Sequence, residues 1–512
     1  MLITQLLSQI AVKNPTRPAY RYLGKETSFS ELKIRVARLS YLFQNEIGHH
    51  PGGVRVAFLA RNSPALIQTF FALTNIRATS IPIDPDRPRD EIENWLKESG
   101  ATHLAVTSDL IAPAREILSS ARLSLPIIEI EKKQGGEYDS SFTAQTDNQP
   151  AENDIILILR TAGTTGHPKL VTFTHKQLRF GASSIRGTYH INLSDRFLTK
   201  ISWAHPFAFL HALLFPILSG ATVVIDHGLE GAEFLDFLIE SRTNRVLGAP
   251  LFFWKLLMTC RSEKRTLPGI KSITVAGGPL SSDVARVFGL MKISVGHCYG
   301  QTENLWTISM QDTALSEGSS SAEKGLPGFK YKVVDDNGDE IPGPKPRTGR
   351  LAVTTPTAMS GYYRHGAEKK DLAQETKNAL RGTWLYTGDV ARLDGDGDTL
   401  SIQLLGRQSD LLHIDEEYES LNEVNQVLKE IQGVDDGAAF IVPRATGKPI
   451  VLCAIVRGAG SISDKQILDY CVGKLPANLA PKAVAFTDFI PKDFGNQPNY
   501  TKLRHQFSGI TS

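Results

Sequence analysis

Helical and extended apolar segments alternate along most of this chain, and that alternation limits the folds it can adopt. Residues 30–45 carry apolar side chains at helical spacing. Extended apolar runs occur at 54–59 and 79–83, with an apolar helical run at 65–76 between them. Strands that alternate with helices are typical of parallel sheets covered by helices. We therefore expect an α/β fold.

The pattern changes after about residue 325. Short strands and turns follow as far as residue 405, and the remaining residues combine helices and strands in a small α+β arrangement. The sequence therefore predicts a large N-terminal domain over residues 1–405, with helix-covered sheets and a β-rich part at about 325–405. It also predicts a small C-terminal domain over residues 406–512.

Charge and hydropathy give no sign of a nucleic-acid or membrane partner. The 512 residues include 56 Lys and Arg against 54 Asp and Glu, so the formal net charge is only +2. This balance creates no strong field for a polyanion. Pro216, Ser219 and Gly220 interrupt the apolar run at 207–225, which reads as a buried helix followed by a strand. The N-terminus lacks the features of a signal peptide, and we expect a cytoplasmic protein.

A loop of small and hydroxyl residues follows the apolar strand at 155–159. It contains Thr161, Ala162, Gly163, Thr164, Thr165 and Gly166, and Lys169 lies three positions further on. Such a loop offers backbone N–H groups and hydroxyls to phosphate oxygens, and the lysine adds a positive charge. The order differs from GxxxxGK[ST], which disfavours a Walker-type nucleotidase.

This loop, TAGTTGHPK, resembles the signature (T/S)SGTTGxPKG of the adenylate-forming superfamily. That superfamily includes acyl-CoA and aryl-CoA synthetases, nonribosomal peptide synthetase adenylation domains and luciferases. Motifs in the family's order run from near Phe29 to Phe507, although Ala162 replaces a serine and Leu170 replaces the final glycine. The resemblance implies an enzyme that uses ATP to convert a carboxylic acid into an acyl- or aryl-adenylate and pyrophosphate.

A second motif, YGQTE at 299–303, resembles the family's YGxTE. Tyr299 offers an aromatic face to adenine, and Thr302 offers a hydroxyl to a phosphate. Glu303 offers a carboxylate to Mg²⁺, which prefers hard oxygen ligands. The resemblance places Gly300 and Gln301 in the same ATP-binding segment.

Two further motifs imply ribose contacts. Asp389 ends WLYTGD, which resembles (W/Y)xxTGD, and a carboxylate can accept two hydrogen bonds from a diol. Arg407 lies in LGRQSD, which resembles the family's hinge GRxDD, and would reach the ribose or a phosphate. After this hinge the small C-terminal domain is expected to move as a lid.

The hinge region departs from the family pattern at three positions. Ser409 replaces the usual hinge aspartate, His413 a lysine and Glu416 a glycine. In the family, the glycine lets the pantetheine arm pass. The side chain and charge of Glu416 are therefore expected to make free CoA a poor acceptor and to favour a carrier protein or an amine. The acceptor could be CoA, a carrier-protein thiol or an amine, and in each case we expect it to arrive in trans.

The C-terminal lysine motif, GK(I/V)xRxxL in the family, is shifted by one residue. Aligning the family's RxxL on Arg504 and Phe507 puts Thr501 at the lysine position. We favour Lys502 as the catalytic lysine, because a cation can neutralise the carboxylate and phosphate charge of the adenylation transition state. Lys492 is the next candidate.

The resemblance implies that the acid binds near His205, Gly277 and Gly278, and that Gly277 also belongs to the ATP-binding residues. His205 stands where amino-acid-activating relatives carry an aspartate, so an ordinary α-amino acid is disfavoured as substrate. The imidazole could donate to a phenol, an amide or a second carboxylate. With Lys502, Lys169 and Thr302, it completes the predicted catalytic set.

A second interpretation is a nucleotide-binding scaffold or sensor that has lost catalysis. The altered hinge and the shifted lysine motivate it, whereas Lys169, Glu303, Asp389 and Arg407 argue against it. The cofactors implied by the resemblance are ATP and Mg²⁺, and it also suggests a role in secondary metabolism.

Overall fold

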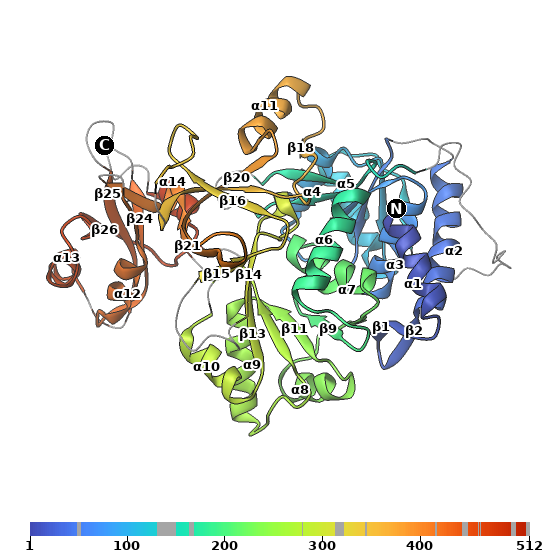
Figure 1. Cartoon of the computed structure of the whole chain (residues 1–512), viewed down its shortest axis with the longest axis horizontal. Helices are drawn as coiled ribbons and strands as arrows, with labels where there is room; N and C mark the ends of the chain where they lie inside the picture. The colour runs from blue at the N-terminus through green and yellow to red at the C-terminus, as the bar shows by residue number, and fades with distance from the viewer. Residues whose placement is uncertain are drawn as a thin grey trace.

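The computed structural model describes most of the chain: residues 1–48, 53–130, 150–162, 168–278, 280–312, 322–343, 346–414, 417–442, 449–458, 460, 462–492 and 498–507. Two large sheets with their helices make up the bulk of the molecule, and a small group of strands and helices lies to the left in Figure 1. The predicted α/β class is confirmed. The predicted loop residues Gly163, Thr164, Thr165 and Gly166 lie outside the described residues.

One sheet has seven strands in the order β18-β8-β7-β4-β3-β5-β6. The five strands from β7 to β6 pair in parallel, whereas β8 and β18 are antiparallel to their neighbours. The bounds are β3 Arg55–Leu59, β4 Thr79–Ile83, β5 His103–Val106, β6 Ile127–Glu129, β7 Ile155–Arg160, β8 Leu170–Thr174 and β18 Gly361–Tyr363. The antiparallel pairing of β7 with β8 was not predicted from the sequence.

The second sheet has fourteen strands, and its first part is mainly parallel, from β1 through β10, β9, β11 and β12 to β13. Antiparallel strands extend it into the region after residue 300. The bounds are β1 Pro18–Tyr22, β2 Lys25–Ser28, β9 Arg196–Thr199, β10 Thr222–Val224, β11 Arg245–Gly248, β12 Ser272–Val275, β13 Ser294–Tyr299, β14 Ser309–Asp312, β15 Ala322–Gly325, β16 Lys330–Val334, β17 Arg347–Thr354, β19 Leu380–Arg381, β20 Trp384–Asp394 and β21 Ser401–Arg407.

The helices of this region cover the two sheets, except for α11, which has no buried residue. Figure 1 shows α11 at the upper edge of the molecule, away from the other helices. The bounds are α1 Ile3–Lys13, α2 Phe29–Ile47, α3 Pro64–Asn75, α4 Arg89–Ser99, α5 Ile111–Ala121, α6 His175–Thr188, α7 Phe215–Leu218, α8 Gly231–Glu240, α9 Pro250–Ser262, α10 Ser282–Leu290 and α11 Lys369–Ala379.

Local sequence explains where α2 begins and which face it buries. Ser28 accepts a hydrogen bond from the backbone N–H of Glu31, and the Glu31 carboxylate accepts one from the N–H of Ser28. This reciprocal pair satisfies two N–H groups that a helix start leaves free. Leu32, Val36 and Phe43 follow at helical spacing and are buried. The periodicity at 30–45 therefore predicted this helix correctly.

The apolar run at 207–225 is a buried helical segment followed by a strand, as predicted. Its helical part is a π-helix, Ala208–Leu214, that continues into α7, and the strand is β10. Among the described residues, no helix is long and apolar enough to cross a membrane.

The C-terminal residues form a three-stranded sheet, β24-β25-β26, packed against helices, together with a separate two-stranded pair. The bounds are β22 Leu411–Ile414, β23 Glu417–Ser420, α12 Asn422–Glu430, β24 Val434–Val442, β25 Ile450–Arg457, α13 Asp464–Lys474, β26 Ala483–Phe486 and α14 Tyr500–Gln506. Two apolar clusters of this region contain only residues from 412 to 507. The boundary between residues 405 and 406 stays a prediction.

Candidate active site

Two hydrogen bonds between Thr161 and Lys169 join the two ends of the predicted phosphate loop. The backbone N–H of Thr161 donates to the carbonyl of Lys169 at 2.9 Å, and the N–H of Lys169 donates to the Thr161 hydroxyl at 2.9 Å. Because β7 and β8 are antiparallel, the two ends of the loop leave and enter the sheet side by side. Thr161 therefore closes the loop at its base, and Ala162 is exposed beside it.

Lys169 is held by groups that follow β8 much later in the sequence. Its Nζ lies 4.4 Å from the centroid of the Tyr362 ring and 3.5 Å from a carboxylate oxygen of Glu375 on α11. The pairing of β18 with β8 brings Tyr362 next to Lys169, since Tyr362 is in register with Val171. Neither Tyr362 nor Glu375 was predicted from the sequence.

The YGQTE segment forms a tight turn whose backbone has little freedom. A Cβ on Gly300 would lie 2.3 Å from the Cα of Trp306, so only glycine fits there. The N–H of Trp306 donates to the carbonyl of Gln301 at 2.8 Å. Leu305 and Trp306 both adopt left-handed φ angles, 59° and 57°. Such residues cost roughly 1 kcal/mol each and persist only where the surroundings hold them.

A buried histidine that the sequence analysis missed packs behind this turn. The His211 Nε2 lies 3.2 Å from the carbonyl oxygen of Leu305, and its ring stacks on Phe207. Burial lowers the pKa of His211 to about 4, so the imidazole is neutral near pH 7. A neutral ring that contacts a carbonyl through Nε2 carries its proton there. His211 therefore donates to one of the two left-handed residues.

Glu303 lies on the Thr302–Asn304 turn, and Thr302 is buried beside it. The Tyr362 hydroxyl donates to Glu303 Oε1 at 2.9 Å, and the Glu303 carbonyl accepts from the N–H of Met359 at 2.7 Å. Oε2 makes no hydrogen bond or ion pair with another described residue. Within the described part of the chain, no three His, Cys, Asp or Glu side chains gather as a metal cage.

These features fit Mg²⁺ rather than a tightly caged ion. Mg²⁺ is usually held by one or two carboxylates together with water and substrate phosphates. Among the described residues, Oε2 of Glu303 has no partner, and Lys169 contacts the same tyrosine as Oε1 does.

Asp389 and Arg407 face each other on neighbouring strands. They are register partners in the β20–β21 pair, and Arg407 Nε lies 3.1 Å from Asp389 Oδ1. The side chain of Asp389 is 6% exposed. Burial raises the pKa of Asp389, and Arg407, Tyr299 and Gln301 act in the opposite direction. Asp389 in turn raises the pKa of Arg407.

Both carboxylate oxygens of Asp389 already have partners. Its Oδ2 accepts hydrogen bonds from the Tyr299 hydroxyl and, at 3.0 Å, from Gln301 Nε2, while Oδ1 lies in the ion pair with Arg407. An ionised carboxylate offers about four lone-pair positions. The two hydrogen bonds occupy both positions of Oδ2, so a ribose hydroxyl must bind at Oδ1, where it competes with Arg407.

Replacing Arg407 with leucine is expected to destabilise the protein by about 3 kcal/mol at pH 7.5, because it leaves the buried Asp389 carboxylate without its counter-ion. This is the lower end of the usual range, since Arg407 is 32% exposed. The folded-state pKa of Asp389 should rise further above its unfolded value. The penalty is therefore fully present above the folded pKa and shrinks as the pH falls. Urea midpoints at pH 7.5 and 5.5 measure it.

The matched control for this prediction is Arg407→Leu combined with Asp389→Asn. Removing both charges should return most of the lost stability and abolish the pH dependence. A single Arg407→Leu variant as stable as the wild type at both pH values would contradict the ion-pair assignment.

His205 lies beside the same turn, with its ring 5.7 Å from that of Trp306. Burial, with a smaller contribution from Arg87, lowers the pKa of His205 to about 3, so the ring is neutral near pH 7. Its Nδ1 accepts from the backbone N–H of Phe207 at 3.3 Å, which leaves the proton on Nε2. His205 can therefore act as a neutral donor to a substrate, but not as a cation.

The remaining predicted site residues are Gly277, Gly278 and Lys502, and the structure does not bring all of them together. Gly277 follows β12 with φ 87°, a left-handed angle that favours glycine, and Gly278 is partly exposed next to it. Lys502 lies on α14, where it is exposed. Its side chain contacts none of the other predicted site residues that the structure describes. Glu416 lies outside the described residues, as does the neighbouring Asp415.

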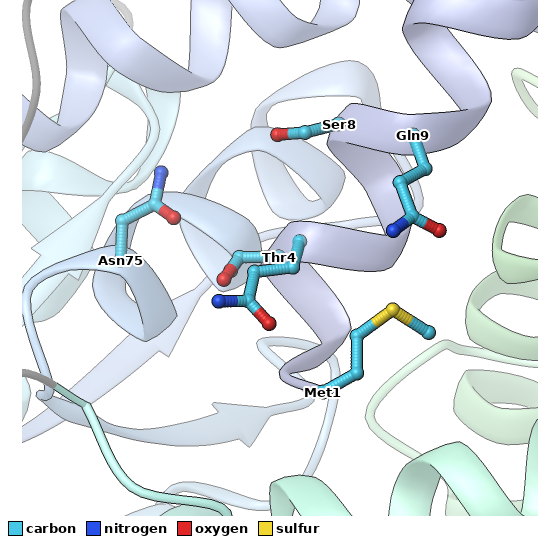
Figure 2. A pocket seen from close by; sticks show the side chains of 6 residues that line it. Met1, Thr4, Ser8, Gln9 and Asn75 are labelled. Carbon is cyan, nitrogen blue, oxygen red and sulfur yellow. The ribbon is translucent and has the colours of Figure 1, made fainter.

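A surface cavity of about 510 Å³ lies elsewhere, between α1 and α3. Figure 2 shows the labelled side chains of α1 on one side and Asn75 of α3 on the other. The lining residues are Met1, Thr4, Gln5, Ser8, Gln9 and Asn75. None of them is a predicted site residue, so this cavity is not the candidate active site.

A family model described as AMP-binding enzyme matches residues 7–363. The chain belongs to the AMP-binding enzyme family. This confirms the resemblance drawn from the motifs and the prediction of an AMP-forming acid ligase. The catalytically impaired scaffold is not favoured.

Known members of the AMP-binding enzyme family match the chain over nearly its full length. A feruloyl-CoA synthase of an Amycolatopsis species is 26% identical over 499 residues, which are 96% of each chain. ATP-bound MatB of Rhodopseudomonas palustris superposes with a TM-score of 0.82 at 21% identity over 100% of both chains. O-succinylbenzoate CoA synthetase of Bacillus subtilis, in complex with ATP and magnesium, gives 0.80 at 21% identity over 98% of this chain and 99% of that one.

Proposed function

We propose that this protein uses ATP to activate a carboxylic acid and then transfers the acyl group to CoA. The observation that carries the proposal is the AMP-binding family match together with the Asp389–Arg407 pair beside the Tyr299–Glu303 turn. In the first step, a carboxylate oxygen attacks the α-phosphorus of ATP and pyrophosphate leaves. In the second step, the CoA thiolate attacks the acyl carbon and AMP leaves.

Each of the predicted site residues has its own role in the adenylation step. Lys169 and the phosphate loop bind the phosphates, Tyr299 contacts the adenine, and Asp389 and Arg407 bind the ribose. When bound at Glu303, Mg²⁺ supplies positive charge beside the phosphates. Lys502 neutralises charge at the reacting carboxylate and α-phosphate. Most of the catalysis is thus positioning and electrostatic stabilisation.

The acid is proposed to be aromatic or of medium size and apolar, with a group that accepts a hydrogen bond. His205 is neutral with a protonated Nε2, so it suits a phenol, an amide or a carboxylate oxygen better than an ammonium. The relative named feruloyl-CoA synthase supports an aryl acid. Pyrophosphate release with ATP across a panel of aryl, fatty and dicarboxylic acids tests this choice. Release that no acid stimulates would contradict the proposed function.

The small C-terminal unit after residue 405 is proposed to rotate between the two steps. Arg504 Nη1 contacts Asp410 Oδ1 at 2.9 Å and the Ser409 carbonyl at 3.0 Å. This contact ties α14, which carries Lys502, to the predicted hinge. A rotation at Ser409 and Asp410 would therefore carry Lys502 with it. The cytoplasmic location and a role in secondary metabolism remain predictions.

Relatives named as a CoA synthase and a CoA ligase support CoA as the acceptor, and a carrier-protein thiol or an amine remains an alternative. Glu416→Gly is expected to raise the rate of acyl-CoA formation several-fold, because it removes a side chain and a charge that opposes the CoA phosphates. Adenylation should not change. Thioester formation with the cognate acid, ATP and CoA measures the effect.

The control for this acceptor prediction is Glu423→Ala, which removes an exposed charge of α12. It should leave thioester formation unchanged. If Glu416→Gly behaves like Glu423→Ala and free CoA is already used efficiently, the predicted obstruction at Glu416 is wrong.

A further inference from the structure

Tyr362 is the one described side chain that contacts both Lys169 and Glu303. The Lys169 Nζ lies over its ring at 4.4 Å from the centroid, and its hydroxyl donates to Glu303 Oε1 at 2.9 Å. Lys169 lies immediately before β8 of one sheet, and Glu303 lies after the end of β13 of the other sheet. A single phenol therefore joins the two charged groups assigned to the phosphates and to Mg²⁺.

The surroundings fix Tyr362 in this position. The backbone of β18 pairs with β8, and the N–H of Tyr362 donates to the Thr376 hydroxyl on α11 at 3.1 Å. A tyrosine phenol is protonated at neutral pH, so the hydroxyl is a donor to Glu303 Oε1.

We propose that Tyr362 is a positioning residue that sets the place of Glu303 through its hydroxyl and the place of Lys169 through its ring. The inference rests on the proposed function. A hydrogen bond on Oε1 orients the carboxylate and leaves Oε2 for the metal, while the ring face favours a cation and limits where the flexible Lys169 side chain can go. The hydroxyl and the ring of Tyr362 should therefore have separable effects on nucleotide binding.

Two substitutions separate them. Tyr362→Phe removes the hydroxyl and keeps the ring, whereas Tyr362→Leu removes both. Tyr363→Phe is the matched control, because Tyr363 is the next residue of β18 and contacts Arg55 instead. The readout is equilibrium binding of an ATP analogue with a methylene bridge between the α- and β-phosphorus, measured by calorimetry with and without Mg²⁺. Thermal melting of each variant without ligand checks folding.

Tyr362→Phe should bind the analogue as the wild type does without Mg²⁺, and about tenfold more weakly with Mg²⁺, as expected for one lost hydrogen bond to a charged group. Tyr362→Leu should weaken binding in both conditions, and Tyr363→Phe in neither. In a Glu303→Ala background, Tyr362→Phe should add nothing.

The proposal is overturned if Tyr362→Phe matches the wild type with Mg²⁺, or if both Tyr362 variants lose affinity equally in the two conditions. The latter result would mean that Tyr362 only supports packing. A wild-type protein that does not bind the analogue would instead overturn the proposed function, so the two failures are distinguishable.

Discussion

Glu303→Ala is expected to abolish ATP–pyrophosphate exchange driven by the cognate carboxylic acid. The substitution removes the carboxylate that Tyr362 holds on the turn through Oε1, and Oε2 has no partner among the residues that the structure describes. Without it, Mg²⁺ loses its protein ligand in the proposed site, and phosphate charge is no longer neutralised in the correct place. Isotope exchange at saturating ATP, acid and Mg²⁺ measures the loss.

Glu303→Gln is the matched control. It keeps an oxygen that can accept the hydrogen bond from Tyr362 but has no charge, so it should fail nearly as completely as Glu303→Ala. If Gln restores exchange, the role of Glu303 is to hold Tyr362, and the metal assignment is wrong. Exchange that survives Glu303→Ala unaltered would contradict any catalytic role for this carboxylate.

Lys502→Ala is expected to lower the rate of adenylation by about 10²-fold or more, the effect of losing one donor to transition-state charge. Stability should hardly change, since Lys502 is exposed. The start of α14 is capped through the backbone: Asn499 Oδ1 accepts from the N–H of Lys502 at 3.0 Å. Single-turnover formation of the adenylate measures the effect apart from the transfer step.

Lys492→Ala serves as the comparison, because the Lys492 ammonium is paired with Asp436 at 2.9 Å and so has a structural role. It should leave adenylation unchanged. Lys502→Ala combined with Thr501→Lys should recover part of the rate if α14 tolerates the shift by one residue. A near-normal rate in Lys502→Ala with a deficit in Lys492→Ala would transfer the assignment to Lys492.

The parts of the fold that depend on local pattern could be predicted from the sequence. The stripe of Leu32, Val36 and Phe43 and the capping pair at Ser28 determine α2 within the segment itself. The Asp389 and Arg407 motifs were likewise found as short strings. The sequence could not show that these two residues are register partners, because strand pairing depends on the whole sheet.

The contacts around Lys169 were not predictable in the same way. Tyr362 lies 193 positions after Lys169 in the numbering and reaches it only because β18 adds antiparallel to β8. The one available signal was an aromatic pair, Tyr362 and Tyr363, after Gly361. Glu375 on the exposed helix α11 gave no signal at all. Long-range side-chain contacts of this kind follow from topology rather than from local propensity.

The protonation state of His205 is a third property that could not be predicted from the sequence. The sequence placed this residue near the acid and left its charge open. In the structure its ring lies partly buried beside the Trp306 turn, and this desolvation lowers the pKa of the imidazole so that it is neutral near pH 7. The apolar run was correctly predicted to be helical, but its π-helical geometry, which includes His211, has no signature in hydropathy alone.

The crowded hydrogen bonding of Asp389 has a consequence for the heat of nucleotide binding. Because Tyr299 and Gln301 already fill Oδ2, a ribose hydroxyl must bind at Oδ1, where it competes with the Arg407 ion pair. The enthalpy gained at the sugar is then offset by the weakening of that pair, and it should be small. Most of the affinity for ATP must therefore come from the phosphates and the base.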